Sequence, residues 1–158
     1  MLLLSYGFLL LLYWSQLICA QLFAIEGADS TIMYLPAEQK DAEDVRDYVS
    51  KKTNGQRKIN LCPGDLKSEQ VCIDSVKNHM STFGRLDVLV NNAAQQLENH
   101  DITTLDSKQW IDTFQINMHS YFYTSKAALP HMPKGSSIIN MCSVNAFSEY
   151  ILRTSDPS

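Results

Sequence analysis

The stretch "LDVLVNNAAQQ", residues 86–96, decides the fold of this chain. Residues 86–90 are apolar at every position but Asp87, a pattern typical of a buried strand. The strand ends in two asparagines, whose amides both donate and accept hydrogen bonds, and two alanines, whose side chains are very small. This ending indicates that a ligand or another backbone comes close to the chain at 91–94.

The composition indicates one globular domain. The chain has 158 residues, of which 45% are hydrophobic and 19% charged, enough for a sizeable core. Its net charge is −4 and it has no basic run, which argues against nucleic acid or an anionic membrane as the partner.

The cysteines and histidines show no metal-ligand spacing. Cys19, Cys62, Cys72 and Cys142 lie far apart without a CxxC pair, so we expect buried, reduced thiols and a reducing compartment. The four histidines, which have no carboxylate or thiolate at ligand spacing, are expected on the surface: His79, His100, His119 and His131.

The N-terminal residues 1–20, "MLLLSYGFLLLLYWSQLICA", are uncharged and mostly apolar. A secretory leader would place Ile18 and Ala20 before a cut at Gln21, although no basic n-region precedes them. A membrane anchor fits the length of about 20 residues, although several polar residues weaken it.

The rest of the chain alternates strand and helix. Helical patterns are expected at 37–55, 67–84 and within 104–129, and strands at 29–35, 57–62, 86–90 and 136–142. Strands separated by helices of this length indicate βαβ units and a parallel sheet. Ligands of such sheets bind beyond the carboxyl ends of the strands, here at 64–66, 91–94 and 142–145.

These three strand ends carry motifs of a known family. Asp65 lies 26 residues before Asn91, Asn117 lies 26 after it, and "INMCS" ends at Ser143. On these motifs, from about residue 21 to 147, the chain resembles the short-chain dehydrogenase/reductase family. "YLP" at 34–36 and "PGDL" at 63–66 are similar to NADP-type reductases grouped with glucose and ribitol dehydrogenases. The resemblance implies a Rossmann-like, doubly wound parallel sheet in three αβα layers.

The resemblance also implies a set of cofactor-binding residues. Asp65 would accept a hydrogen bond from the adenine amine, with a backbone group of Leu66 beside it. Asn91 would cap its strand and contact the adenosine ribose. Ala93 and Ala94 would let the cofactor approach the backbone, although the family usually has glycine at position 94, which is more open.

The catalytic residues implied by the family are Ser143 and Asn117. Ser143 would hydrogen-bond the substrate oxygen and stabilise its developing charge. Asn117 would break its helix and hold a water in a proton relay, which suits a residue whose amide competes for the backbone. Lys126 could reach the cofactor phosphates, but as a helical lysine it is better explained as a solvated side chain.

The cofactor is expected to be NADP rather than NAD. The reason is that "MYLPA" carries no acidic residue at the end of the second strand to hold a free ribose 2′-hydroxyl.

The chain departs from the family pattern on both sides of this region. The glycines of TGxxxGxG should lie near Leu10, Trp14 and Gln16. The family's tyrosine belongs 12 to 14 residues after Ser143, where the chain has Ser, Asp and Pro at 155–157, and its lysine comes four residues later. A YxxxK match at 48–52 precedes the serine and is a chance match.

We therefore expect a partial family domain at 21–158 that lacks the first strand, the glycine-rich loop and the C-terminal part. Residues 1–20 would be a leader in their place, either a signal or anchor or an alternative or mis-predicted first exon. One continuous helix is expected from about 9 to 26. Without the central strand, two sheet edges would lack partners and the chain would be marginally stable.

The expected function is hydride transfer between NAD(P)H and a small carbonyl or alcohol, inactive in this form because the proton donor is missing. One alternative is a non-catalytic remnant that pairs with itself or with a full-length relative through the 104–129 helix. Another is a secreted or membrane-tethered binding module, with a membrane partner only if the leader is an anchor. A cytoplasmic location is favoured.

Overall fold

The computed structural model describes residues 6–11, 14–97, 99 and 101–143. Its strands are β1 (Tyr6–Leu11), β2 (Ala28–Tyr34), β3 (Ile59–Pro63), β4 (Val88–Asn91) and β5 (Ser137–Asn140). Its helices are α1 (Trp14–Ile25), α2 (Gln39–Lys52), α3 (Glu69–Phe83), α4 (Ser107–Phe114) and α5 (Ser120–Ala128). A π-helical turn, Gln115–His119, joins α4 to α5, and short 3-10 helices cover Pro36–Glu38, Ile102–Thr104 and Leu129–His131.

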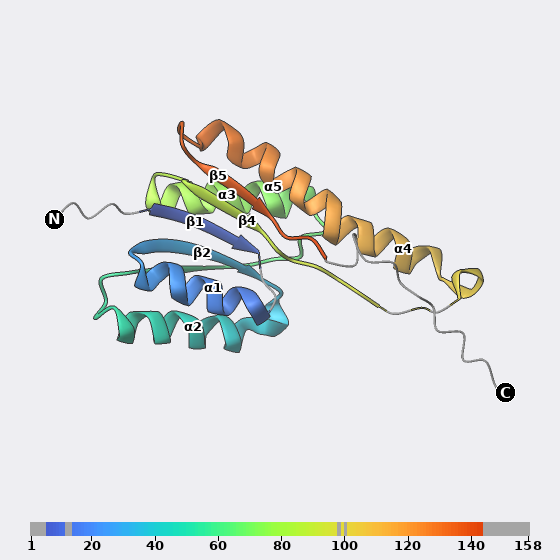
Figure 1. Cartoon of the computed structure of the whole chain (residues 1–158), viewed down its shortest axis with the longest axis horizontal. Helices are drawn as coiled ribbons and strands as arrows, with labels where there is room; N and C mark the ends of the chain where they lie inside the picture. The colour runs from blue at the N-terminus through green and yellow to red at the C-terminus, as the bar shows by residue number, and fades with distance from the viewer. Residues whose placement is uncertain (1–5, 12–13, 98, 100, 144–158) are drawn as a thin grey trace.

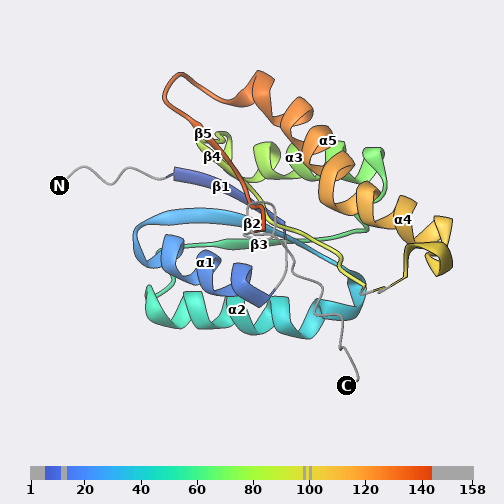
Figure 2. The ribbon, with the colours of Figure 1, turned by 45° about the vertical axis from the view of Figure 1, so that its right-hand side comes forward.

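The strands form one parallel sheet in the order β3-β2-β1-β4-β5. Helices α1 and α2 cover one face, and α3 and α5 cover the other (Figure 1, and turned in Figure 2). Helix α4 extends beyond the carboxyl ends of the strands. The predicted three-layer, doubly wound arrangement is therefore confirmed.

The N-terminal segment corrects the sequence-based prediction. Residues Tyr6–Leu11 form β1 in the centre of the sheet, where Leu10 is in register with Ile32 of β2 and Val90 of β4. The expected absence of the first strand and the helix from residue 9 are both wrong, because helix α1 begins only at Trp14. A strand buried on both faces is a continuous apolar run, which periodicity alone does not distinguish from a buried helix.

This correction removes the reason for the expected instability. The edges of β2 and β4 that face the centre of the sheet are both paired with β1. Helix α1 runs through residue 20, so the expected boundary between leader and domain falls inside a helix. Among the described residues, no helix has the length and apolar character needed to cross a membrane.

Two apolar clusters hold the layers together, one on each face of the sheet. The cluster under α3 and α5 consists of Met33, Leu66, Cys72, Val76, Leu86, Leu89, Ala93 and Ala128. The cluster under α1 and α2 consists of Ala20, Ala24, Ile32, Tyr34, Ala42, Val45, Val49, Ile59 and Val90. The first cluster contains two predicted cofactor-binding residues, so the core and the site share side chains.

The histidine and cysteine predictions hold only in part. His79 is fully buried on α3, where its Nδ1 lies 2.9 Å from Thr31 Oγ1 and its Nε2 lies 2.9 Å from the Arg85 carbonyl oxygen. His119 is exposed as expected, and His100 lies outside the described residues. Cys72 is a buried free thiol, but Cys142 is exposed.

Candidate functional site

The carboxyl ends of the strands border two adjoining cavities. The first, of about 280 Å³, is lined by Met33, Tyr34, Leu35, Glu38, Gly64, Asp65, Leu66, Ala93, Ala94, Gln95, Gln96, Leu97 and Ile116. The second, of about 540 Å³, is lined by Asn92, Ala94, Gln95, Gln96, Leu97, Thr113, Asn117, Met118, Tyr121, Met141, Cys142 and Ser143. Residues 94–97 line both, so the segment after β4 is the wall between them.

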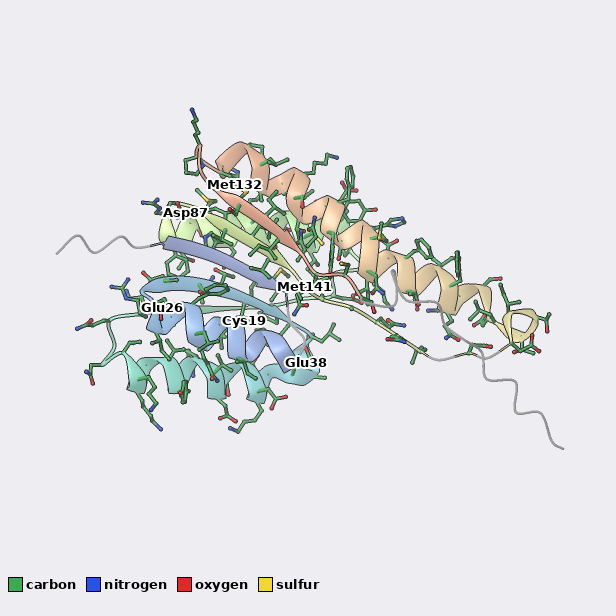
Figure 3. The ribbon with its side chains drawn as sticks, in the orientation of Figure 1. Cys19, Glu26, Glu38, Asp87, Met132 and Met141 are labelled. Atoms are coloured by element: carbon green, nitrogen blue, oxygen red, sulfur yellow. The ribbon has the colours of Figure 1, made fainter. Side chains whose placement is uncertain are left out.

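Figure 3 shows the two edges of the sheet. Glu38 and Met141 are labelled at the carboxyl edge, and Glu26 and Asp87 at the opposite edge. Glu38 follows β2 and lines the first cavity, whereas Met141 follows β5 and lines the second. The cavities therefore lie side by side along the edge where ligands of parallel α/β sheets bind.

Asp65 and Leu66 form the turn from β3 into α3 and border the first cavity. The Lys67 amide donates to Asp65 Oδ1 at 2.9 Å, and the Ser68 amide donates to the Asp65 carbonyl oxygen at 3.1 Å. Leu66 is only 8% exposed and packs in the core. Asp65 is thus a turn residue and a cavity residue at once, with its carboxylate exposed at the cavity.

Gly64 lines the first cavity, within the strand end 64–66 where the sequence analysis expected a ligand. Its amide donates to the Tyr34 carbonyl oxygen at 2.9 Å, which ties the ends of β2 and β3 together. A Cβ at this position would lie 2.5 Å from Val71 Cγ1, closer than the neighbour could tolerate without moving. The Pro-Gly pair at 63–64 is the sequence signal for the turn that begins here.

Ala93 and Ala94 differ in what they contribute. Ala93 is 5% exposed and belongs to the core, whereas Ala94 is exposed and lines both cavities. The small side chains predicted to admit a ligand are therefore at the cavity wall, with Ala94 in the open position.

Asn91 is a scaffold residue. Its side chain is fully buried: Nδ2 donates to Asn140 Oδ1 at 2.8 Å and to Ser125 Oγ at 3.1 Å, and Oδ1 accepts from Thr124 Oγ1 at 2.8 Å. Both amide hydrogens are used inside the protein. The side chain therefore joins β4 to β5 and α5 through an internal network, and the expected ribose contact of Asn91 stays a prediction.

Asn117 lies in the π-helical turn, where the sequence analysis expected a break in the helix. Its Oδ1 accepts from the Gln95 amide at 2.7 Å, and its Nδ2 donates to the Gln95 carbonyl oxygen at 3.0 Å. Both side-chain atoms therefore hold the backbone of the wall between the cavities. Single π-turns inside α-helices are frequent at functional sites.

Ser143 and Tyr121 lie at the second cavity. Ser143 is exposed and is the last described residue of the segment after β5. Tyr121, which the sequence analysis did not single out, is half-buried, and burial, with a smaller contribution from Cys142, raises its pKa to about 12. The phenol therefore stays protonated at neutral pH and can only donate or accept hydrogen bonds there.

Lys126 is not brought to either cavity. Its Nζ lies 3.6 Å from Glu69 Oε1 and 5.7 Å from the centre of the Phe122 ring. It lines a separate hollow between α3 and α5. This position agrees with the solvated helical lysine that the sequence analysis preferred.

Comparison with known proteins decides the family. The sequence model of the short chain dehydrogenases matches residues 17–155. The chain belongs to the short-chain dehydrogenase family. It is 46% identical over 126 residues to the uncharacterized oxidoreductase YhxC of Bacillus subtilis, covering 80% of this chain and 43% of that protein.

Two further proteins to which the chain is similar are described with the cofactor NADPH. The chain is 39% identical over 127 residues to the NADPH-dependent aldehyde reductase 1 of Arabidopsis thaliana, covering 79% of this chain and 44% of that protein. A blue fluorescent protein from a metagenomic library, solved in complex with NADPH, aligns with a TM-score of 0.79 at 25% identity, covering 90% of this chain and 57% of that protein. The chain spans less than half the length of the curated relatives it matches.

Proposed function

We propose that this chain is the nucleotide-binding part of an oxidoreductase that transfers hydride between NAD(P)H and a small carbonyl or alcohol. The observation that carries the proposal is the wall shared by the two cavities, residues 94–97. On one side of it lie Asp65 and Leu66, and on the other lie Asn117 and Ser143. A dinucleotide that crosses this wall would join an adenine site to a reaction site.

The first cavity fits the adenosine half of such a cofactor. Leu66, Ala93 and Ile116 give it apolar walls, and Asp65 supplies an acceptor for an exocyclic amine. The turn uses Asp65 Oδ1, and no described residue forms a hydrogen bond with Oδ2. The volumes of about 280 and 540 Å³ together lie within the usual range of ligand sites.

The second cavity fits the reacting groups. When bound, the nicotinamide would exchange the hydride with the substrate. The Ser143 hydroxyl would donate a hydrogen bond to the substrate oxygen and stabilise its negative charge. Asn117 would act as a positioning residue, because its amide already holds the Gln95 backbone on both sides.

The described residues of the second cavity include no good proton donor for the substrate. The family's tyrosine would lie at 155–157, which are Ser, Asp and Pro and fall outside the described residues. Tyr121 lies at the second cavity, but a phenol whose pKa is raised to about 12 is a poor proton donor to a substrate at neutral pH. We therefore propose that the 158 residues bind the cofactor weakly and do not turn over.

The test is nucleotide binding by the 158-residue chain, measured by NADH and NADPH fluorescence. Asp65→Asn keeps the turn acceptor but presents an amide to the adenine, and should weaken binding about tenfold. The matched control is Asp101→Asn, because Asp101 Oδ1 also accepts a turn amide, from Thr103 at 2.8 Å, but lines neither cavity. Absence of binding by the unmodified chain would refute the proposal.

The second measurement is NADPH consumption with a panel of aldehydes, ketones and sugars. We expect no turnover by the unmodified chain or by Ser143→Ala. Turnover that depends on Ser143 would show that another residue supplies the proton, with Tyr121 and Tyr150 as the first to substitute.

A second candidate function is pairing through the 104–129 helix, with another copy of the chain or with a longer relative. Four large apolar side chains follow one another at every fourth position of α4–α5 and are 39–61% exposed: Trp110, Phe114, Met118 and Phe122. A contiguous apolar stripe of this kind is typical of a protein interface.

A further inference from the structure

Gln115, the first residue of the π-helical turn, contacts the turn that carries Asp65, although Gln115 itself lines neither cavity. Its side chain is half-buried, and its Nε2 donates to the Lys67 carbonyl oxygen at 2.7 Å. The two residues lie 48 positions apart in the sequence, so this hydrogen bond is a tertiary contact between the end of α4 and the segment before α3. Gln115 can therefore hold this turn without touching a ligand in the cavity.

Lys67 links Gln115 to the Asp65 carboxylate. Its carbonyl oxygen accepts from Gln115, and its amide donates to Asp65 Oδ1 at 2.9 Å. Its side chain is held as well, because Nζ lies 3.1 Å from Oδ2 of Asp112 on α4. A change at Gln115 therefore reaches the carboxylate of Asp65 through a single intervening residue.

The orientation of the Gln115 amide is fixed from its other side. His119 Nδ1 lies 2.8 Å from Gln115 Oε1, and because that oxygen can only accept, the ring nitrogen donates. With its oxygen turned toward His119, the amide presents its nitrogen to the Lys67 carbonyl. Both ends of this half-buried side chain thus have partners, and the contact with Lys67 has a defined direction.

The same helical segment also holds the wall between the cavities. Asn117, two residues after Gln115, holds the Gln95 backbone through both of its side-chain atoms. Gln109 on α4 adds another contact, since its Nε2 donates to the Leu97 carbonyl oxygen at 2.9 Å. Helix α4 and the π-helical turn therefore fix the turn that carries Asp65 relative to residues 94–97.

We infer that Gln115 is a positioning residue for nucleotide binding, which sets the Asp65 carboxylate relative to the wall at 94–97. The inference rests on the proposed function, because it assumes that the adenine amine binds to Asp65. Asp65 is exposed and lies in a turn, so its position depends on the contacts that hold this turn. A binding group that is ordered in advance costs less to order on association, and this tightens binding.

The test combines Gln115→Met with Asp65→Asn in a double-mutant cycle. Methionine has a similar length but no amide, so it removes both hydrogen bonds of Gln115 and keeps a flexible side chain at the same place. Gln115→Glu is the second variant, which keeps the acceptor for His119 and loses only the donor to the carbonyl. Circular dichroism checks that each variant is folded.

The measurement is the affinity of the 158-residue chain for NADH and NADPH, followed by fluorescence. The matched control is Gln70→Met on α3. The Nε2 of Gln70 also donates a hydrogen bond, to Asp74 Oδ1 at 2.8 Å, but Gln70 lines neither cavity. This control shows what the loss of a glutamine amide does away from the turn at 65–67.

We expect Gln115→Met and Gln115→Glu to weaken binding of both dinucleotides about three- to tenfold, as for the loss of one hydrogen bond. In the Asp65→Asn background, which lacks the contact that is positioned, the same changes should have little further effect. Gln70→Met should have little effect in either background. Equal losses in the two backgrounds, or no loss, would overturn the inference alone. Failure of the unmodified chain to bind either dinucleotide would overturn the proposed function together with it.

Discussion

Strands β2 and β5 belong to the same parallel sheet but differ in how well they are covered. Six of the seven residues of β2 are buried, whereas none of the four residues of β5 is. β2 pairs with β1 and β3 and lies under α1 and α2, whereas among the described strands β5 pairs only with β4. Ile138 of β5 packs against the α3–α5 cluster, but Ile139, on the opposite face, is 42% exposed.

This difference indicates which of the two cavities is bordered by the better-packed strands. The first cavity lies beyond β2 and β3, whose ends are tied by the Gly64 amide. The second is walled by residues 141–143, which follow β5, the least covered of the strands β2 to β5. The proposed nucleotide site should therefore keep its geometry under changes that loosen the proposed substrate site.

The largest expected effect comes from truncating a matched pair of isoleucines. Ile32 of β2 is fully buried, so Ile32→Ala should lower the free energy of unfolding by about 2–5 kcal/mol. Ile139→Ala on β5 should cost less than about 1 kcal/mol, because the side chain is already 42% exposed. Urea unfolding followed by circular dichroism measures both. Equal losses for the two variants would show that β5 is covered in solution.

A smaller loss is expected from Gly64→Ala, which probes the tie between β2 and β3. The new methyl group would lie 2.5 Å from Val71 Cγ1 and should cost about 1–3 kcal/mol of unfolding free energy. Val71→Ala removes the opposing methyl groups, so Gly64→Ala should cost much less in that background. A cost that is equal in both backgrounds would mean that the clash with Val71 is not its cause.

Helices α2 and α3 were predictable because each has a polar face and a defined end. Helix α3 begins at its Ser68 cap, whose Oγ accepts from the Val71 amide, and ends at Gly84 with φ 74°. β1 was not predictable in this way, since "YGFLLL" at 6–11 is a mostly apolar run without polar alternation. Residues 6–11 are identified as a strand only by their pairing with β2 and β4 in the folded sheet.

The site was predictable to the extent that it depends on strand ends. Asp65, Ala94, Asn117 and Ser143 all line the two cavities. The direction in which a side chain turns could not be read from the sequence, and Asn91 turns into the core. Glu38 and Tyr121 also line the cavities, but they lie outside the strand ends, and nothing in the sequence around them predicts this position.

His79 should make stability depend on pH. Burial lowers its pKa below the ordinary value, and the lone pair on Nδ1 faces the Thr31 hydroxyl while Nε2–H donates to the Arg85 carbonyl. Below pH about 6.5 the unfolded chain binds a proton that the folded chain resists. Unfolding free energy should therefore fall with decreasing pH, by at most about 1.4 kcal/mol per pH unit from this residue.

The measurement is urea unfolding from pH 7.5 to 5, with His79→Gln and the exposed His119→Gln compared with the unmodified chain. His79→Gln lowers stability at every pH but should flatten the dependence between pH 6.5 and 5. His119→Gln should leave the slope unchanged. A slope that survives in His79→Gln would assign the dependence to other groups.

The smallest effect on stability is expected on the outer face of α5, where the apolar stripe is exposed. Phe122 is 61% exposed, so Phe122→Ser should change the unfolding free energy by no more than about 0.5 kcal/mol. If the stripe pairs with a second copy, the same change should shift the chain from dimer to monomer in sedimentation velocity. Tyr48→Ser on α2 is the matched control, because Tyr48 is another exposed aromatic residue, 38% exposed, outside the stripe. An unmodified chain that sediments as a monomer at all accessible concentrations would exclude self-pairing, and a partner for the stripe would then have to be a longer relative.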